Sequence, residues 1–146
     1  MRGPNYWSIT RHKLIAMVLD LQELDGTLST DLPGFNLRLE KMFPALAGYN
    51  RASRESKDFF GRAGEGILMN EVVEHIALHI QTLAGMDVSF GRTGYYGEKG
   101  VYNVVFAYLE EEVGKYAASA AVRICESLIN NVDYDLEKDI QEMQEI

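Results

Sequence analysis

The chain has 146 residues, a length that fits one domain with a substantial hydrophobic core but not two domains. Its formal net charge of -8 argues against nonspecific binding to nucleic acid or anionic membranes, which require basic surface, and is compatible with a cationic or zwitterionic partner. The single cysteine excludes an internal disulfide, and the chain has neither a signal-like start nor a long apolar run, so we expect a cytoplasmic protein.

The first third of the chain predicts a loop, a strand and a helix. Residues 1–12 are typical of an ordered loop, in which Tyr6 and Trp7 are expected to cover the edge of the core. The apolar run within residues 13–21 favours a strand, although its length also allows a helix. A helix is expected between Gly34 and Pro44, followed by an exposed connection over residues 48–58.

A long central helix is predicted over about residues 59–84 and ends at Gly85. Its apolar side chains recur at helical spacing and fill roughly half of the circumference. Glu71, Glu74 and His75 then lie on the polar half, and His79 lies at the boundary of the apolar arc.

Two strands and a second long helix are predicted in the remainder of the chain. The strands cover residues 86–92 and 100–109, a glycine-rich link joins them, and the helix covers about residues 111–130. Cys125 within this helix is expected to be a core residue. The sequence therefore predicts an α+β fold: a small, mostly antiparallel sheet with helices packed on one face, two of them long. The expected domain is 1–132, and the acidic helical tail 133–146 is expected to be a linker.

The central helix carries the most distinctive set of polar side chains. Positions 71, 75 and 79 are four residues apart and project from neighbouring turns, a spacing that can hold a divalent metal with Glu74 as a base beside it. The same residues can equally form the polar margin of an amphipathic helix. Positions 71 and 79 lie roughly 12 Å apart along the axis, so the pair Glu71 and His75, or next the pair His75 and His79, is favoured over all three.

Several distinctive blocks are spread along the sequence. They are Arg-Gly-Pro-Asn-Tyr-Trp-Ser (2–8), Gly-Glu-Gly (64–66), Glu-His-Ile-Ala-Leu (74–78), Gln-Thr-Leu-Ala-Gly-Met (81–86), Phe-Gly-Arg-Thr (90–93), Gly-Val-Tyr-Asn-Val-Val (100–105) and Ala-Ala-Val-Arg (120–123). In this order, the blocks resemble the N-terminal domain of cyanophycin synthetases. The resemblance extends over nearly the whole chain, to the tail at 134–136.

The resemblance implies a parent enzyme that joins aspartate and arginine into a branched polymer, using ATP and Mg²⁺. Its ligase domains would lie beyond residue 146, and the N-terminal domain would hold the growing polymer. The glycines of this chain fit neither the dinucleotide fingerprint nor the P-loop, so no nucleotide site is expected within it. The implied partners are the polymer and the parent's ligase domains.

The resemblance also implies a second function, because many members of that family have a metallopeptidase-like site that cuts the polymer into primers. This site has the pattern His-x-x-Glu-His on a helix. Carried over, Glu74 would be the general base and His75 a zinc ligand. Position 71 is Glu71 where the pattern has histidine, and position 79 is His79 where the family commonly has glutamate. Because zinc accepts oxygen or nitrogen ligands, these residues can still supply a Zn²⁺ site, completed by Glu111 or its neighbour in the next helix.

Further candidates for contact with the polymer lie around the glycine-rich link. The guanidinium of Arg92 can pair with a carboxylate of the polymer or can brace Glu65 or a helix end. Tyr95, Tyr96 and Lys99 can contact the polymer or simply belong to a tolerant surface loop.

Overall fold

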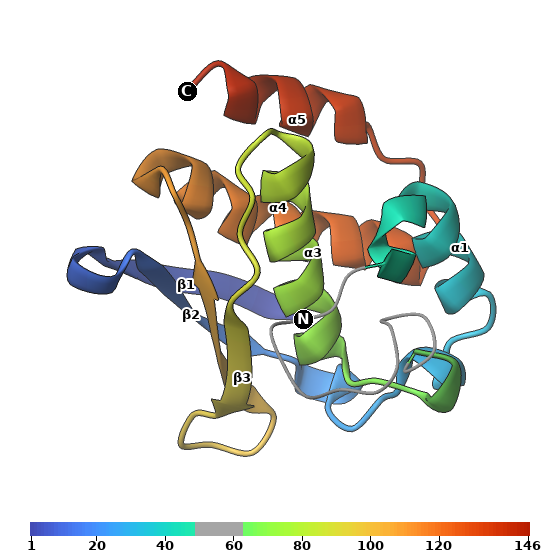
Figure 1. The fold of residues 1–146 in the computed structure, drawn as a ribbon. Helices are drawn as coiled ribbons and strands as arrows, with labels where there is room; N and C mark the ends of the chain where they lie inside the picture. The colour runs from blue at the N-terminus through green and yellow to red at the C-terminus, as the bar shows by residue number, and fades with distance from the viewer. Residues whose placement is uncertain (49–62) are drawn as a thin grey trace.

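The computed structural model describes residues 1–48 and 63–146, which form an α+β fold with a four-stranded antiparallel sheet (Figure 1). The strands lie in the order β1-β2-β4-β3. Their bounds are Arg2–Ile9 for β1, Leu14–Asp20 for β2, Gly91–Tyr95 for β3 and Val101–Ala107 for β4. The predicted fold class is confirmed.

In the described part of the chain, the α-helices that accompany the sheet are α1 (Phe35–Met42), α3 (Met69–Leu83), α4 (Glu111–Asn130) and α5 (Leu136–Gln144). Short 3-10 turns occupy Thr10–His12, Gln22–Leu24, Ser29–Asp31 and Pro44–Gly48. Among the described residues, none of the helices combines the length and the apolar character that a membrane span requires.

The two faces of the sheet have different environments. Side chains alternate along each strand, and the inner face of β2 and β4 is fully buried, as at Met17 and Val104, which pair across the strands. Helix α3 packs against β3 and β4, while α4 packs against β1 and β2 (Figure 1). In residues 1–48 and 63–146 no helix packs on the opposite, outer face of the sheet.

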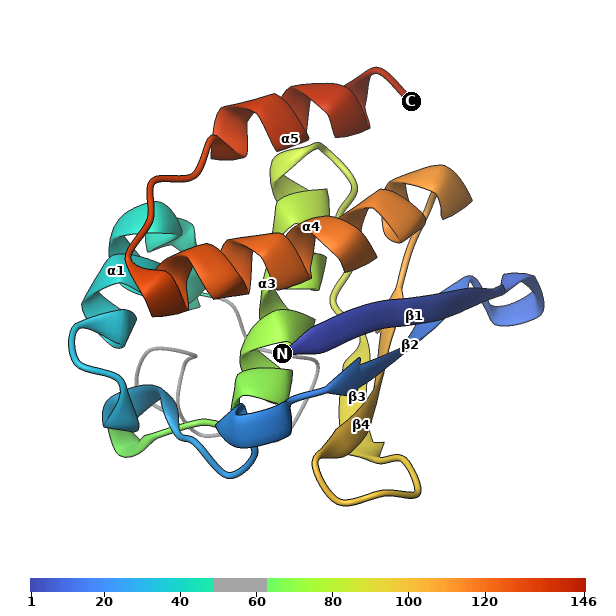
Figure 2. The ribbon, with the colours of Figure 1, turned by 180° about the vertical axis from the view of Figure 1, so that it is seen from behind.

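A third layer lies outside the two long helices. Helix α5 packs on α3 and α4 (Figure 2), and Met143 is 1% exposed in this contact. The side chain of Asp135 caps α5 by accepting a hydrogen bond from the backbone N–H of Lys138. The tail is therefore helical, as predicted, and docked on the domain. The expectation that it leads to further domains stays a prediction.

The predicted N-terminal loop is instead the edge strand β1, which pairs with β2 along most of its length. The pairing register of β1 with β2 shifts between Arg2 and Asn5. The turn-forming residues that predict a loop lie at this irregularity. Pro4 is compatible with a strand here because β1 lies at the edge of the sheet. Trp7 is 44% exposed and Tyr6 is 38% exposed, so neither aromatic ring is enclosed in the core.

The central helix begins at Met69, later than predicted. Residues 63–65 are helical, but Gly66 has φ +99°, and a Cβ there would lie 2.9 Å from the Thr30 hydroxyl. Leu68 is extended and forms a β-bridge with Leu28 before the helix starts. Its predicted end at Gly85 is confirmed. The predicted connection 48–58 and the start of the predicted helix lie almost wholly outside the described residues.

The strand predicted over residues 86–92 is displaced toward the glycine-rich link and lies at Gly91–Tyr95. The backbone of β3 finds hydrogen-bond partners where it runs beside β4. The pairing extends from Gly91, which lies opposite Phe106, to Tyr95, which lies opposite Tyr102. The strands at 13–21 and 100–109 and the helices at 35–43 and 111–130 are confirmed. Cys125 is fully buried in α4, and this burial raises the pKa of its thiol to about 12.

Candidate functional site

The polar side chains of α3 lie in the interior of the domain. Glu74 and His75 are 0% exposed and His79 is 4% exposed, while Glu71 is partly exposed. The prediction of a solvent-facing polar half is therefore wrong for Glu74 and His75. The reason is position: α3 lies between the sheet on one side and α4 and α5 on others, which leaves little of its circumference to solvent.

Glu74 points toward the sheet at the start of β3. A Cβ built on Gly91 would lie 2.8 Å from both Cγ and Oε2 of Glu74, so the carboxylate fits only because residue 91 has no side chain. One turn earlier, the side-chain amide of Asn70 donates a 2.8 Å hydrogen bond to the hydroxyl of Thr93. These two contacts join α3 to β3.

The two histidines of α3 are directed differently. His75 Nδ1 lies 2.8 Å from the backbone carbonyl of Glu71, to which it donates, and 3.9 Å from Glu74 Oε2. The ring of His79 packs edge-on against Phe43, with ring centroids 5.5 Å apart. Burial lowers the pKa of His79, because the charged imidazolium loses its hydration.

These positions do not fit a zinc site. Glu111 begins α4, where its carboxylate forms an ion pair with Lys115 at 3.0 Å. In the described part of the chain, no three His, Cys, Asp or Glu side chains are grouped as metal ligands. The carboxylate of Glu74 is packed against Gly91 rather than presented to an open position, as a base for a bound water would have to be. We therefore derive no step through Zn²⁺ from these residues.

A second set of functional candidates lies on the outer face of the sheet. Cross-strand pairing aligns Trp7, Ala16, Val105 and Arg92 in one row across all four strands. Trp7 and Arg92 are exposed at the two edges of the sheet, and Ala16 between them is 2% exposed because its larger neighbours cover it. Within residues 1–48 and 63–146 the Arg92 side chain forms no ion pair.

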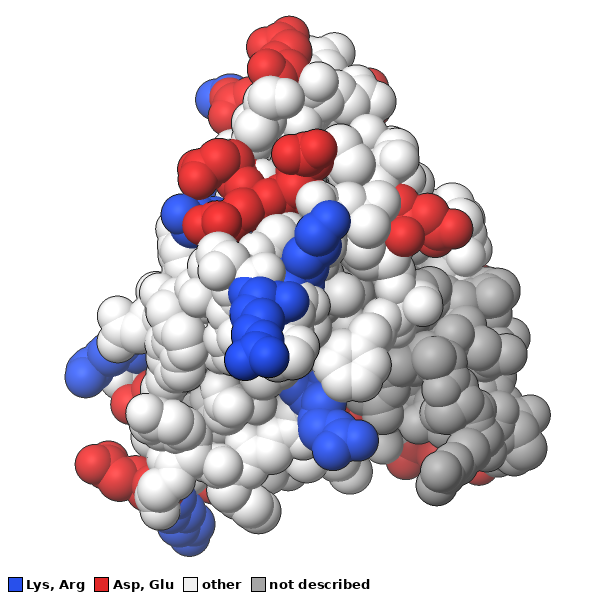
Figure 3. Space-filling view, turned by 60° about the vertical axis from the view of Figure 1, so that its left-hand side comes forward, with Lys and Arg blue, Asp and Glu red and all other residues white. Residues whose placement is uncertain are grey.

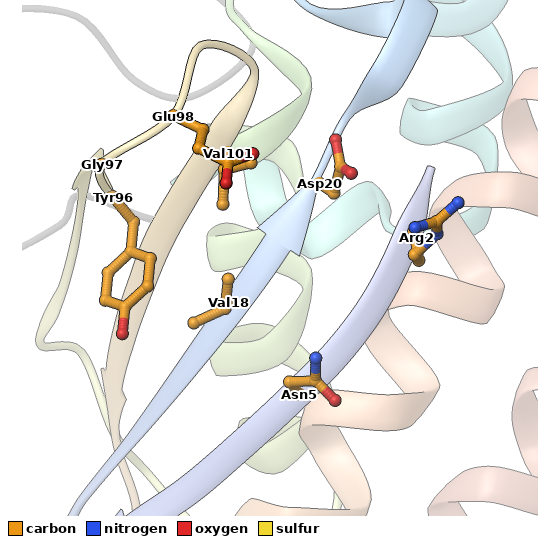
Figure 4. Close-up of a pocket in the computed structure, with 8 residues that line it drawn as sticks. All are labelled: Arg2, Asn5, Val18, Asp20, Tyr96, Gly97, Glu98 and Val101. Carbon is orange, nitrogen blue, oxygen red and sulfur yellow. The ribbon is translucent and has the colours of Figure 1, made fainter.

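A hollow of about 400 Å³ lies at one end of this outer face (Figure 4). Val18 and Val101 contribute to its floor, and the link between β3 and β4 borders it. Charged and polar side chains surround this floor. The complete lining is Arg2, Asn5, Val18, Asp20, Tyr96, Gly97, Glu98 and Val101.

Hydrogen bonds hold the link beside the hollow in a defined turn. The backbone N–H of Tyr96 donates to the carbonyl of Val101 at 3.0 Å, and that of Val101 donates to the carbonyl of Glu98 at 3.2 Å. Tyr95 is 79% exposed and stacks on Tyr102, with ring centroids 5.1 Å apart. Sequence reasoning singled out Tyr96 but missed Arg2 and Asp20, because the strand that carries Arg2 was interpreted as a loop.

Both signs of charge occur on the side of the molecule that includes the β1–β2 hairpin. Basic side chains lie near the middle of this face, a group of acidic side chains lies above them, and further acidic side chains lie at its lower left (Figure 3). The hairpin turn supplies the exposed residues Arg11 and Lys13. The start of α4 supplies the acidic residues Glu111 and Glu112.

The sequence model described as "Cyanophycin synthase-like N-terminal domain" matches residues 16–130. This match covers β2, α1, α3, the β3–β4 hairpin and α4, which together form most of the sheet and the long helices on it. The chain belongs to the family of cyanophycin synthase-like N-terminal domains.

Curated relatives show the same similarity over the complete chain. The chain is 47% identical over 149 aligned positions to the cyanophycin synthetase of Trichormus variabilis and 44% identical over 149 positions to that of a Synechocystis strain. It is 45% identical over 146 positions to that of Geminocystis herdmanii. In each comparison 100% of this chain is covered, but it spans only 16% or 17% of the relative.

Proposed function

We propose that this domain binds cyanophycin, the branched polymer of aspartate and arginine, while ligase domains of a parent synthetase extend it with ATP. The proposal is supported by the family to which the chain belongs. The observation that carries it is the outer face of the sheet, which no described helix covers and which presents Trp7 and Arg92.

The chemistry of this face suits such a polymer. The Arg92 guanidinium can pair with a carboxylate through two parallel N–H donors, and the Trp7 indole can stack on a guanidinium. Both groups lie in the same cross-strand row, so one extended polymer segment can reach both. A sheet is also a rigid support, which keeps its contact groups in fixed register.

The charge distribution agrees with a ligand that carries both signs. Each arginine-bearing unit of the polymer presents a cation, and the net charge of -8 attracts cations over distances of about a Debye length, roughly 10 Å. The basic side chains near the middle of the face that includes the β1–β2 hairpin can meet the carboxylates of the polymer (Figure 3). Hydrolysis of the polymer is not the favoured function, because residues 1–48 and 63–146 contain no group of three side chains that could hold a metal ion.

Co-sedimentation with insoluble cyanophycin tests this function. The purified domain should be retained by the polymer, and Arg92→Gln should weaken retention roughly threefold to fivefold, the effect of one exposed ion pair. Lys138→Gln is the matched control, because it removes one exposed positive charge from α5, on the opposite side of the molecule. Equal retention of both variants would remove Arg92 from the site, and no retention of the unaltered domain would refute polymer binding.

A further inference from the structure

The hollow at the end of the outer sheet face brings both signs of charge to one small site. Arg2 comes from β1 and Asp20 from β2, and these two residues are paired in the register of the strands. Glu98 and Tyr96 come from the link between β3 and β4, on the other side of the floor formed by Val18 (Figure 4). Three separate segments of the chain therefore converge on one concave surface.

The charged groups of the hollow are available to a ligand. In the described part of the chain, none of Arg2, Asp20 and Glu98 takes part in an ion pair. Asp20 Oδ1 accepts one hydrogen bond, from the backbone N–H of Gln22 at 3.0 Å. Tyr96 is 48% exposed, so its ring offers an open face.

A branched polymer of aspartate and arginine presents a particular chemical unit. Aspartate has two carboxyl groups, so an aspartate chain can carry arginine only through its side-chain carboxyl. A branch joined through the arginine amino group then ends in one guanidinium and one free carboxylate, a few ångströms apart. The hollow offers acceptors for the cation and a donor for the anion within about 400 Å³, a volume typical of small-ligand sites.

We propose that this hollow is a subsite that binds a single aspartate–arginine branch of the polymer. The proposal rests on the polymer-binding function and specifies where one repeating unit is held. Asp20 and Glu98 accept hydrogen bonds from the branch guanidinium, which stacks on the ring of Tyr96. Arg2 donates to the branch carboxylate. Charge complementarity selects this occupant over a phosphate, which the two carboxylates would repel, and over a purely cationic chain, which leaves Arg2 without a partner.

Titration of the 146-residue protein with the side-chain-linked aspartate–arginine dipeptide, followed by NMR at low salt, tests the subsite. Signals of Tyr96, Val18 and Asn5 should shift together in a saturable manner. Glu98→Gln and Tyr96→Ala should each weaken dipeptide binding about threefold to fivefold. Two matched controls should bind the dipeptide as the unaltered protein does: Glu145→Gln at the C-terminal cap of α5, and Tyr95→Ala at the neighbouring tyrosine, which stacks on Tyr102.

The outcomes separate the subsite from the general function. If the polymer is retained but the dipeptide shifts no signal of the hollow, or Glu98→Gln binds it unchanged, the subsite is refuted and polymer binding stands. If the dipeptide shifts the signals of the hollow but the polymer is not retained, the hollow binds the dipeptide alone, and both polymer binding and the role of the hollow as a polymer subsite are refuted. Equal shifts with agmatine, which has the guanidinium of arginine but no carboxylate, and with the dipeptide would overturn the assigned role of Arg2. Neither retention nor shifts would refute both proposals.

Discussion

At the scale of single residues, Glu74 and Gly91 make the contact that fixes the distance between α3 and β3. The carboxylate of Glu74 is fully buried, and its Oε2 occupies the space that a side chain at position 91 would need. A glycine at this position is therefore required by packing, since Gly91 does not have a positive φ. The interior of the domain should be intolerant of added volume here.

Gly91→Ala should destabilise the domain by about 2 kcal/mol, because the new Cβ forces Glu74 or the strand to shift. Gly94→Ala in the same strand is the matched control, since a Cβ there meets no atom within 4 Å. Urea unfolding followed by circular dichroism measures both effects. Equal urea midpoints for the two variants would contradict the claim that Glu74 fills the space beside Gly91.

His79 should make stability depend on pH. Burial lowers the pKa of His79 below its ordinary value of 6.5, so the unfolded chain takes up this proton at a higher pH than the folded chain does. The contribution of neutral His79 to the free energy of unfolding is then fully present above about pH 6.5. It declines as the pH falls below this value, by at most about 1.4 kcal/mol per pH unit for one group.

His79→Leu should reduce the change of the free energy of unfolding with pH, as measured by urea unfolding between about pH 7.5 and pH 5.5. Identical slopes in the unaltered domain and in His79→Leu would show that this histidine does not titrate differently on unfolding.

At the scale of secondary-structure elements, α5 is attached to the domain through one buried carboxylate. Asp139 is 5% exposed and accepts hydrogen bonds from the hydroxyls of Tyr116, at 2.5 Å, and Tyr134. Arg123 Nη2 lies 3.6 Å from the same carboxylate. Two elements and the connection between them therefore share this group.

Asp139→Ala should release α5 from α3 and α4, because two tyrosine hydroxyls lose their acceptor, at a cost of about 2 kcal/mol. The backbone amides of α5 should then exchange with deuterium faster, while those of β2 and β4 keep their protection. Asp133→Ala, an exposed aspartate before the helix, should leave exchange in α5 unchanged. Uniformly faster exchange over all elements would mean that Asp139 supports the complete fold instead.

Elements with strong local patterns were predictable, and those decided by partners were not. The apolar run of β2, the alternation in β4 and the small-residue helix α4 carry their own signals, and each was located correctly. Strand β1 begins with turn-forming residues and is a strand because β2 supplies its hydrogen bonds. The start of α3 is set by the contact of Gly66 with Leu28 and Thr30, which no local pattern reveals.

The candidate site shows the same division. Four-residue spacing placed Glu71, His75 and His79 on neighbouring turns, but it cannot show that the sheet and two other helices surround that part of α3. The hollow depends on strand register, which aligns Arg2 with Asp20 across β1 and β2, and on the path of the link that carries Glu98. The spacing of residues along one element predicts neither the register between two strands nor the path of the link.

At the scale of the whole molecule, the described residues cover one face of the sheet with helices and place no helix on the other face. Two long helices and α5 lie on one side, while the outer face presents Trp7, Arg92 and the hollow (Figure 1). Among the described residues no helix covers the exposed Trp7 and Arg92, so both side chains are accessible to a ligand. The uncovered face is where a long polymer can lie without displacing any helix.

Retention of the domain by cyanophycin should depend on salt, because the proposed contacts pair exposed charges. Raising NaCl from about 50 mM to about 500 mM shortens the Debye length from roughly 14 Å to roughly 4 Å and should weaken retention severalfold. A sedimentation series at fixed polymer mass measures this. Salt-independent retention would indicate that apolar contacts at Trp7 dominate.

The location of the bound polymer is the central claim, and NMR shift mapping with a short soluble cyanophycin fragment tests it most directly. We expect perturbed side-chain signals on the outer face of the sheet, including Trp7, Val18, Tyr96 and Val105, and unchanged signals on α4 and α5. Perturbations confined to α4 and α5, with the outer face unchanged, would contradict the account.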